Sequence, residues 1–377
     1  MPDVSTPAYD VVFALTGDVR ANARAMRQLG WLSDVGARVL ALSFGPPAPG
    51  PLRPGVTLRP LGIVAGRGPR YFAAVHHAVA EAVRGVRARV FHASDLFVLA
   101  ALARAARRQG AALVFDSREL YPDTHAVSGR PLVRAVWTAV ERRYAPRAHT
   151  VFTVGEAIAD VLAARYRLRA PPVVLHNAPA PFTGAPADLR AYAGVAAGEP
   201  IVLHTGVVRE GRGLPGLVRA MGRVRTGSLV FLGDGPLRPA LEALAAEAGA
   251  RVRFAAPVPP EDVTAYAAGA DVGTVLLEPS GLSQRLALPN KLFESLAAGL
   301  PVVASDLPEV ARVVAGYGVG RLVPPGDEDA LASALAGLLA DPAARAALRA
   351  RIPEALAAFG ESRARARFDS VYRLLLA

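Results

Sequence analysis

Short apolar runs alternate with helix-like segments along almost the whole chain of 377 residues. Continuous apolar runs of this kind are typical of parallel strands buried on both faces, joined by crossover helices. The first half holds six, at residues 11–15, 38–42, 88–92, 112–116, 151–154 and 173–177. The second half holds six more, at 201–205, 228–232, 252–254, 272–276, 302–304 and 321–323. The pattern predicts two doubly wound α/β domains.

Residues 178–199 separate the two halves and are rich in Ala, Pro and Gly without clear periodicity. We therefore expect a first domain over residues 1–180 and a second over 181–360. The segment 361–377 alternates arginines with an apolar face, which predicts an amphipathic helix that packs back on the first domain.

Composition excludes several classes of protein. The chain has no cysteine, which rules out disulfide scaffolds, thiolate metal sites and cysteine nucleophiles. Residues 1–7 lack the pattern of a signal peptide, and no run of 18 apolar residues is free of charge or turn residues. We therefore expect a cytoplasmic protein with no membrane-spanning helix.

The net charge of +11 fits an anionic partner but does not choose one. Residues 130–147 predict a basic amphipathic helix with Arg134, Trp137, Arg142 and Arg143, which could cover a sheet or lie on a membrane. Covering a sheet is the favoured interpretation, and peripheral contact with an anionic membrane stays open. No interleaving of aromatic and basic residues indicates nucleic-acid binding.

Residues 286–306 predict a loop, a helix and a buried strand. Pro289 suits the first helical turn and Asn290 is a candidate cap. Lys291 and Glu294 lie three apart, so both can face one ligand from the start of the helix. Lys291 is the only lysine in the chain, which indicates that this position requires a compact ammonium group.

Several predicted strands of the second half end in glycines before a helix, and such turns suit phosphate because backbone N–H groups are free there. The glycines are Gly206, Gly211, Gly213, Gly233 and Gly235. Arg212 and Lys291 add positive charge, and Glu294 offers a carboxylate to ribose hydroxyls. No Asp-x-Asp pair follows a strand, so we predict a nucleoside diphosphate site that needs no metal and no cofactor.

In the first half, polar residues follow two successive strands, at the edge where open parallel sheets bind ligands. The candidates for substrate contact are His92, Asp95, Asp116, Arg118 and Glu119. The alternative is that the two aspartates cap helices and the others lie on the surface. Gly17 alone follows the first strand, so a nicotinamide or flavin site is not expected.

Specific runs of the second half resemble the retaining family-four (group 1) glycosyltransferases. They are GVVREGRGL at 206–214, LGDGPL at 232–237, LPNKLFE at 288–294 and AGLPVVAS at 298–305. The first half is similar to the same family through FHASD at 91–95, DSRELYP at 116–122 and VLHN at 174–177. The resemblance implies the GT-B arrangement, two facing Rossmann-like domains with a deep cleft between them.

The resemblance also implies roles for residues. Arg212 and Lys291 would stabilise the leaving diphosphate while a sugar moves from a nucleotide donor with its anomeric configuration kept. Glu294 would hold the ribose, and Val258 would contact the base through its main chain. The remaining donor-site positions would be Gly17, Gly206, Gly233, Leu288, Pro289 and Asn290.

Two positions depart from the family pattern. Leu286 stands where a glutamate often precedes Glu294 by eight residues, and Glu278 or Gln284 could compensate. Arg118 stands where a histidine is common, and arginine does not act as a base at neutral pH. Proton acceptance would then fall to His92 or to the donor phosphate itself, and the phosphate is preferred.

Two further functions fit the same features: a nucleotide-sugar epimerase of this fold, and a non-catalytic partner of another transferase. The acceptor stays open among a lipid-linked glycan, a lipid and a small metabolite, and the base of the donor among uridine, guanosine and thymidine.

Overall fold

The computed structural model describes residues 8–45, 52–65, 68–127 and 129–377. The chain divides into two compact units. Unit 1 comprises Met1–Leu175 and Arg365–Ala377, and unit 2 comprises His176–Ala364. The division therefore falls between Leu175 and His176, just ahead of the Ala, Pro and Gly-rich segment.

Unit 1 contains a seven-stranded sheet of order β3-β2-β1-β4-β5-β6-β7, in which every neighbouring pair is parallel. The strands are β1 (Tyr9–Ala14), β2 (Val39–Ser43), β3 (Val56–Pro60), β4 (Ala88–Ala93), β5 (Ala112–Asp116), β6 (Thr150–Thr153) and β7 (Val173–Val174). The strand order reverses between β1 and β4, which makes the ends of these two strands the switch point. No apolar run predicted β3, because this edge strand buries only Val56 fully.

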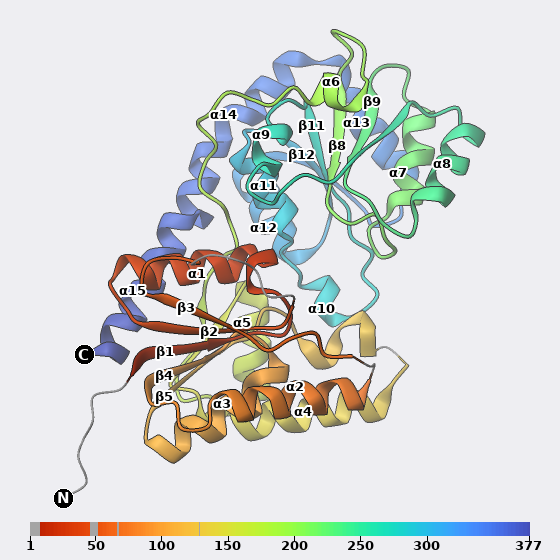
Figure 1. The fold of residues 1–377 in the computed structure, drawn as a ribbon. Helices are drawn as coiled ribbons and strands as arrows, with labels where there is room; N and C mark the ends of the chain where they lie inside the picture. The colour runs from red at the N-terminus through yellow and green to blue at the C-terminus, as the bar shows by residue number, and fades with distance from the viewer. Residues whose placement is uncertain (1–7, 46–51, 66–67, 128) are drawn as a thin grey trace, which may run out of the picture. The chain divides into compact units, whose positions relative to one another are not determined.

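Helices cover both faces of this sheet (Figure 1). They are α1 (Ala23–Asp34), α2 (Pro69–Ala82), α3 (Leu96–Gln109), α4 (Pro131–Tyr144), α5 (Glu156–Arg165) and α15 (Glu361–Leu376). Four single 3-10 turns accompany them: η1 (Val19–Ala21), η2 (Tyr121–Asp123), η3 (His125–Val127) and η4 (Ala145–Arg147). In Figure 1, α2, α3 and α4 lie on one side of the sheet, and α1 and α15 on the other.

The C-terminal helix α15 belongs to unit 1 from Arg365 onward. The ring of Phe368 packs 5.2 Å from that of Trp31 in α1 and 5.6 Å from that of Phe152 in β6. Arg367 donates a hydrogen bond of 2.8 Å to the carbonyl oxygen of Val174. The end of the chain thus supplies core residues to the sheet with which the chain begins.

Unit 2 contains a six-stranded parallel sheet of order β10-β9-β8-β11-β12-β13. The strands are β8 (Ile201–Thr205), β9 (Ser228–Leu232), β10 (Val252–Ala255), β11 (Val272–Val275), β12 (Val302–Ser305) and β13 (Gly320–Val323). The helices are α6 (Leu189–Ala193), α7 (Leu214–Gly222), α8 (Arg238–Glu247), α9 (Val263–Ala267), α10 (Leu282–Arg285), α11 (Asn290–Ala297), α12 (Pro308–Tyr317), α13 (Glu328–Ala340) and α14 (Pro342–Phe359). Its switch point lies between β8 and β11.

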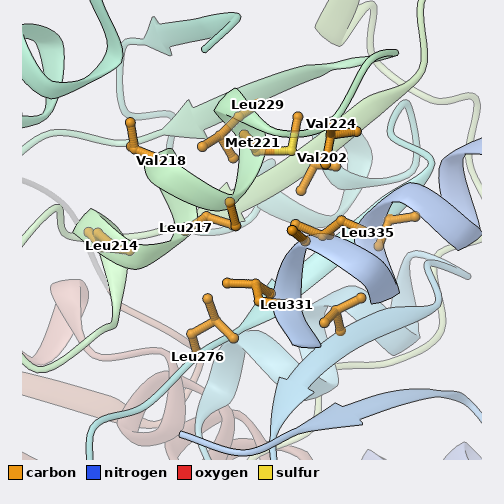
Figure 2. Packing of buried hydrophobic residues seen from close by; sticks show 14 of the residues in the cluster. Val202, Leu214, Leu217, Val218, Met221, Val224, Leu229, Leu276, Leu331 and Leu335 are labelled. Carbon is orange, nitrogen blue, oxygen red and sulfur yellow. The ribbon is translucent and has the colours of Figure 1, made fainter. Parts of the chain in front are cut away.

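One large apolar cluster joins α7 and α13 to the sheet of unit 2. Leu217 and Met221 of α7 and Leu335 of α13 point toward Val202 of β8, and all four are at most 2% exposed (Figure 2). Full burial of each such side chain contributes about 1.5–3 kcal/mol to folding. This packing gives α7 a fixed position beside the end of β8, and the loop between them carries Arg212.

Among the helices of the described ranges, none is by itself long and apolar enough to cross a membrane. Glu328–Ala340 and Pro342–Leu376 pass that test only as a pair bent by 96°.

Candidate functional site

Lys291 lies at the start of α11, next to the switch point of unit 2. Its side chain is only 8% exposed, and Nζ lies 3.3 Å from Nε2 of His204 in β8. The expectation that Asn290 caps this helix is wrong, because Pro289 occupies the cap position and Asn290 is already helical. Instead, Oδ1 of Asn290 accepts a hydrogen bond of 2.6 Å from Asn177.

The charges around Lys291 are mostly positive. Burial lowers the pKa of Lys291 well below its usual value, and Arg212 and Arg209 lower it further, while Glu294 opposes them. Burial and Arg209 also lower the pKa of Arg212. An anion bound here would favour the ammonium form of Lys291 and would pair with the guanidinium of Arg212, which stays charged. The cluster is therefore suited to a multiply charged anion such as a diphosphate.

Backbone approaches backbone closely where β8 and β9 end. A Cβ atom on Gly233 would lie 2.2 Å from the carbonyl oxygen of Gly206, so only glycine fits at this position. Gly233 also has φ of +145° and Gly206 has φ of +97°. The two predicted phosphate turns are thus packed against each other.

Glu278 fixes the loop that carries Arg212. Its backbone N–H donates to the carbonyl oxygen of Gly211, and its carboxylate accepts from the N–H of Gly213, both at 3.2 Å. Because this carboxylate already has a bond, it is less available to replace the glutamate missing at Leu286. Oε1 of Gln284, half-buried in α10, has no hydrogen-bond partner among the described residues.

Three further residues predicted for the donor site, Leu288, Val258 and Glu294, lie in the same unit. Leu288 is buried in an apolar cluster with Leu292 and Phe293, and Val258 packs on a second cluster that includes Ala255. Only the main chain of Leu288 is therefore left for a ligand. Glu294 lies three residues beyond Lys291 on α11 and is half-buried.

The ligand edge of unit 1 is held together by Asp95. Its carboxylate caps α3 by accepting from the N–H groups of Phe97 and Val98, and it also accepts from the N–H of Thr16 at 2.5 Å. This bond anchors the turn after β1, where Gly17 adopts φ of +110°, a conformation that disfavours other residues. The capping alternative for Asp95 is confirmed, and with 1% exposure it has little surface for an acceptor.

The structure places Asp116, which was predicted to lie on the acceptor side, inside unit 1. Asp116 is fully buried, and both oxygens accept hydrogen bonds of 2.8 Å from Arg24, with a third of 2.8 Å from Gln28. Burial raises the pKa of Asp116, but the charge and hydrogen bonds of Arg24 outweigh burial and hold the pKa below its usual value. Asp116 therefore forms an internal ion pair, and it does not cap a helix either.

The structure places His92, for which a catalytic role was predicted, in the core of unit 1. His92 is fully buried, its Nδ1 lies 2.6 Å from the hydroxyl of Tyr372 in α15, and its ring packs 4.5 Å from that of Phe13. Burial lowers the pKa of His92 to about 4. A side chain enclosed in the core cannot reach an acceptor, so His92 links β4 to the C-terminal helix.

Arg118 and Glu119 remain as candidates on this edge. Arg118 is partly exposed, and Tyr121 and Asp95 raise its pKa in spite of burial, so its charge is permanent. Glu119 is exposed. No group of three or more His, Cys, Asp or Glu side chains in the described ranges is arranged to hold a metal ion.

The helix α4 packs on other helices and does not cover the sheet alone. The ring of Trp137 contacts those of Phe72 in α2 and Phe97 in α3, at 5.8 and 5.2 Å. Leu132 and Val136 point away from this packing and are 82% and 60% exposed.

Sequence reasoning missed several residues that the structure brings to these edges: Arg24, Gln28, Thr274 and His204. His204 and Thr274 lie inside apolar strands, and polar residues at such positions are a usable signal for an internal network.

Family models match most of the chain. The model of "Glycosyl transferases group 1" matches residues 199–341, and that of the "Glycosyl transferase 4-like domain" matches residues 15–178. The chain belongs to the group 1 glycosyltransferases of the GT-B type. The two parallel sheets of seven and six strands are the Rossmann-like domains expected for a GT-B glycosyltransferase.

This glycosyltransferase family member is similar to curated relatives over part of their length. It is 44% identical over 81 residues to a phosphatidyl-myo-inositol mannosyltransferase of Mycolicibacterium smegmatis, spanning 22% of this chain and 21% of the relative. A GDP-mannose-dependent phosphatidylinositol monomannoside mannosyltransferase of the same organism is 33% identical over 140 residues, 36% of each chain.

Among solved structures, HepE of Anabaena in complex with UDP-glucose shares the fold, with a TM-score of 0.72 and 17% identity over 96% of this chain and 99% of that one.

Proposed function

We propose that the protein transfers a sugar from a nucleoside-diphosphate sugar to an acceptor hydroxyl. The observation that carries the proposal is the cationic cluster of the buried Lys291 and the half-buried Arg212 at the switch point of unit 2, next to the packed glycine turns. Departure of the nucleoside diphosphate leaves negative charge on its terminal phosphate. Fixed cations at that point stabilise this charge in the transition state, where stabilisation raises the rate.

We propose further that the anomeric configuration is retained. The bond from the anomeric carbon to the phosphate oxygen breaks, and the acceptor oxygen forms its bond on the same face of the sugar. The acceptor proton passes to the departing phosphate oxygen. The burial of His92 and the permanent charge of Arg118 support this route, because neither residue can take the proton. Nuclear magnetic resonance of the product's anomeric centre tests it, and an inverted product would refute it.

Binding of nucleoside diphosphates tests the site without knowledge of the acceptor. UDP, GDP and dTDP are each titrated by calorimetry, since one relative is GDP-mannose-dependent and a structural neighbour binds UDP-glucose. We expect one of them to bind, and Lys291→Ala and Arg212→Ala to weaken binding at least tenfold. Arg223→Ala is the matched control, because this arginine pairs with Asp329 on the surface. The proposal fails if none of the three binds.

Turnover separates transfer from the alternatives. Incubation with donor alone should leave the donor sugar unchanged, whereas an epimerase would alter its stereochemistry. A purified protein that binds a nucleoside diphosphate and yet turns over no donor with any acceptor class would support a non-catalytic partner role.

We propose that unit 1 meets an anionic membrane, which would place the enzyme at the inner face of the bilayer beside lipid-linked acceptors. Unit 1 carries 26 Lys and Arg against 13 Asp and Glu, whereas unit 2 carries 17 against 19. The exposed Leu132 and Val136 lie on α4 together with Arg134, Arg142 and Arg143. This combination of apolar and cationic side chains is typical of helices that lie on anionic bilayers.

Sedimentation with vesicles tests the membrane proposal. We expect binding to vesicles rich in phosphatidylglycerol, loss of binding at high salt, and weaker binding of the variant Leu132→Ser with Val136→Ser. Equal recovery on neutral vesicles would contradict the proposal. A dimer that dissociates in the same variant would instead assign this face to a second copy of the chain.

A further inference from the structure

The side chain of His204 connects Lys291 to the backbone of β8. His204 is fully buried, with Nε2 3.3 Å from Nζ of Lys291 and Nδ1 3.5 Å from the hydroxyl oxygen of Thr274. The hydroxyl of Thr274 donates to the carbonyl oxygen of Leu203 at 3.1 Å. These contacts form a continuous series from the carbonyl oxygen of Leu203 to the ammonium group of Lys291.

The shorter of the two contacts of Thr274 favours one tautomer of the ring. Thr274 has a single hydroxyl hydrogen, and because that hydrogen goes to Leu203, its oxygen faces His204 as an acceptor. We therefore assign the ring hydrogen to Nδ1 and a lone pair to Nε2. Burial lowers the pKa of His204 well below its usual value, and Lys291 and Arg212 lower it further, so the ring stays neutral. A neutral Nε2 accepts a hydrogen bond from Lys291.

Lys291 needs such an acceptor because its surroundings disfavour the ammonium form. The lysine side chain is flexible because its four methylene groups can rotate. Arg209 and Arg212, which lie in the loop after β8, repel its positive charge. The ring that faces it does not move freely, because it packs 5.5 Å from the ring of Phe231 in β9.

We propose that His204 is a positioning residue for Lys291: its Nε2 accepts a hydrogen bond from the ammonium group and aims that group at the phosphates of the donor. This inference rests on the proposed function, which assigns the phosphate contact to Lys291. The simpler alternative is a histidine that only fills the core between β8, β9 and β11. The two interpretations differ in what the side chain supplies: a hydrogen-bond acceptor for Lys291, or only volume that fills the core.

Two substitutions separate the acceptor from the volume. His204→Leu fills similar space without an acceptor, and His204→Gln keeps an oxygen that can accept from Lys291. In titrations with UDP, GDP or dTDP, whichever the wild type binds, we expect His204→Leu to weaken binding about tenfold or more. His204→Gln should recover most of that loss. Equal losses in both variants would overturn the proposal.

A double-mutant cycle tests whether His204 acts through Lys291. In the Lys291→Ala background, His204→Leu should cost no further affinity, because the group that it positions is gone. Full additivity of the two losses would overturn the proposal. Leu348→Ala is the matched control, because it removes buried volume from the core of unit 2 on α14, a helix that carries none of the site residues, and it should leave affinity unchanged at temperatures where the protein is folded.

The pH dependence of binding gives a readout that a purely structural role would not move. Affinity should fall as pH rises through the pKa of Lys291 in the free protein, because the phosphates bind the ammonium form. The charged groups that face Lys291 are Arg209 and Arg212 after β8 and Glu294 on α11. His204→Leu removes the acceptor that favours the ammonium, so the fall should move to lower pH; an unmoved profile would count against the proposal.

These titrations also distinguish failure of the role of His204 from failure of the proposed function. Should the wild type bind none of UDP, GDP and dTDP, the proposed function fails. Should the wild type bind and Lys291→Ala lose binding while His204→Leu binds normally, only the role of His204 fails.

Discussion

The two units place polar residues at the same edge of the same kind of sheet and use them in opposite ways. In unit 1, the carboxylates of Asp95 and Asp116 and the Nδ1 atom of His92 already have hydrogen-bond partners within the unit. In unit 2, Lys291 is buried and Arg212 is half-buried, and the positive charges of Arg212 and Arg209 act against that of Lys291. Buried polar groups that have hydrogen-bond partners stabilise the fold. A buried charge without an opposite charge beside it lowers stability, and it is useful only when a ligand supplies the opposite charge.

The largest effect that tests this comparison is the loss of the ion pair in unit 1. Asp116→Ala should lower the free energy of unfolding by about 3–5 kcal/mol, because it leaves Arg24 buried without its partner. Urea unfolding measures the loss. Asp160→Ala, an exposed carboxylate of α5, is the control and should change stability by less than about 0.5 kcal/mol. An Asp116→Ala protein as stable as the wild type would show that the network is not structural.

The complementary change in unit 2 should affect activity more than stability. Lys291→Arg should lower the rate of sugar transfer by about 10²–10³, because the broader guanidinium does not fit the buried position of the ammonium. The control is Arg219→Lys, an exposed arginine paired with Glu328, for which an unchanged rate is expected. Full activity of Lys291→Arg would mean that positive charge alone suffices.

A third test uses the pH dependence of stability in unit 1. Glu141 of α4 is fully buried beside the hydroxyl of Tyr166, and burial raises its pKa to about 7. Because this folded-state pKa lies above the ordinary value of 4.5, the contribution to stability is present below pH 4.5 and is lost as pH rises through about 7.

The variant Glu141→Gln isolates that contribution. Between pH 4.5 and 8, wild-type unfolding free energy should fall relative to that of Glu141→Gln by up to about 3 kcal/mol. Chemical unfolding across this range measures the difference, and parallel curves for the two proteins would refute the assignment.

The smallest expected effect concerns the buried histidine of unit 1. Tyr372→Phe removes the hydrogen bond to Nδ1 of His92 and should cost about 1 kcal/mol in unfolding free energy with no change in turnover. Phe368→Leu in the same helix controls for loss of packing. A change in turnover at unchanged stability would support the catalytic role predicted for His92.

Much of the fold follows from the sequence because its signals are local. Apolar runs such as 201–205 and 272–276 identify buried parallel strands without reference to any distant residue. The glycines after β1, β8 and β9 and the lone lysine after Pro289 also stand next to recognisable strand or helix ends. The edge strand β3 was missed because half-exposed strands carry no continuous apolar run.

The sequence by itself determined two doubly wound sheets and the strand ends at which a ligand would bind. Only the tertiary structure decided which polar residues at those ends already have partners. Arg24 reaches Asp116 from 92 residues away and Tyr372 reaches His92 from 280 residues away, so neither pairing has a local signature. His204 likewise meets Lys291 across 87 residues, and that contact makes a strand histidine part of the site. Local sequence patterns determine at which strand or helix end a side chain lies. Whether that side chain can bind a ligand depends on the residues that pack against it in the folded protein.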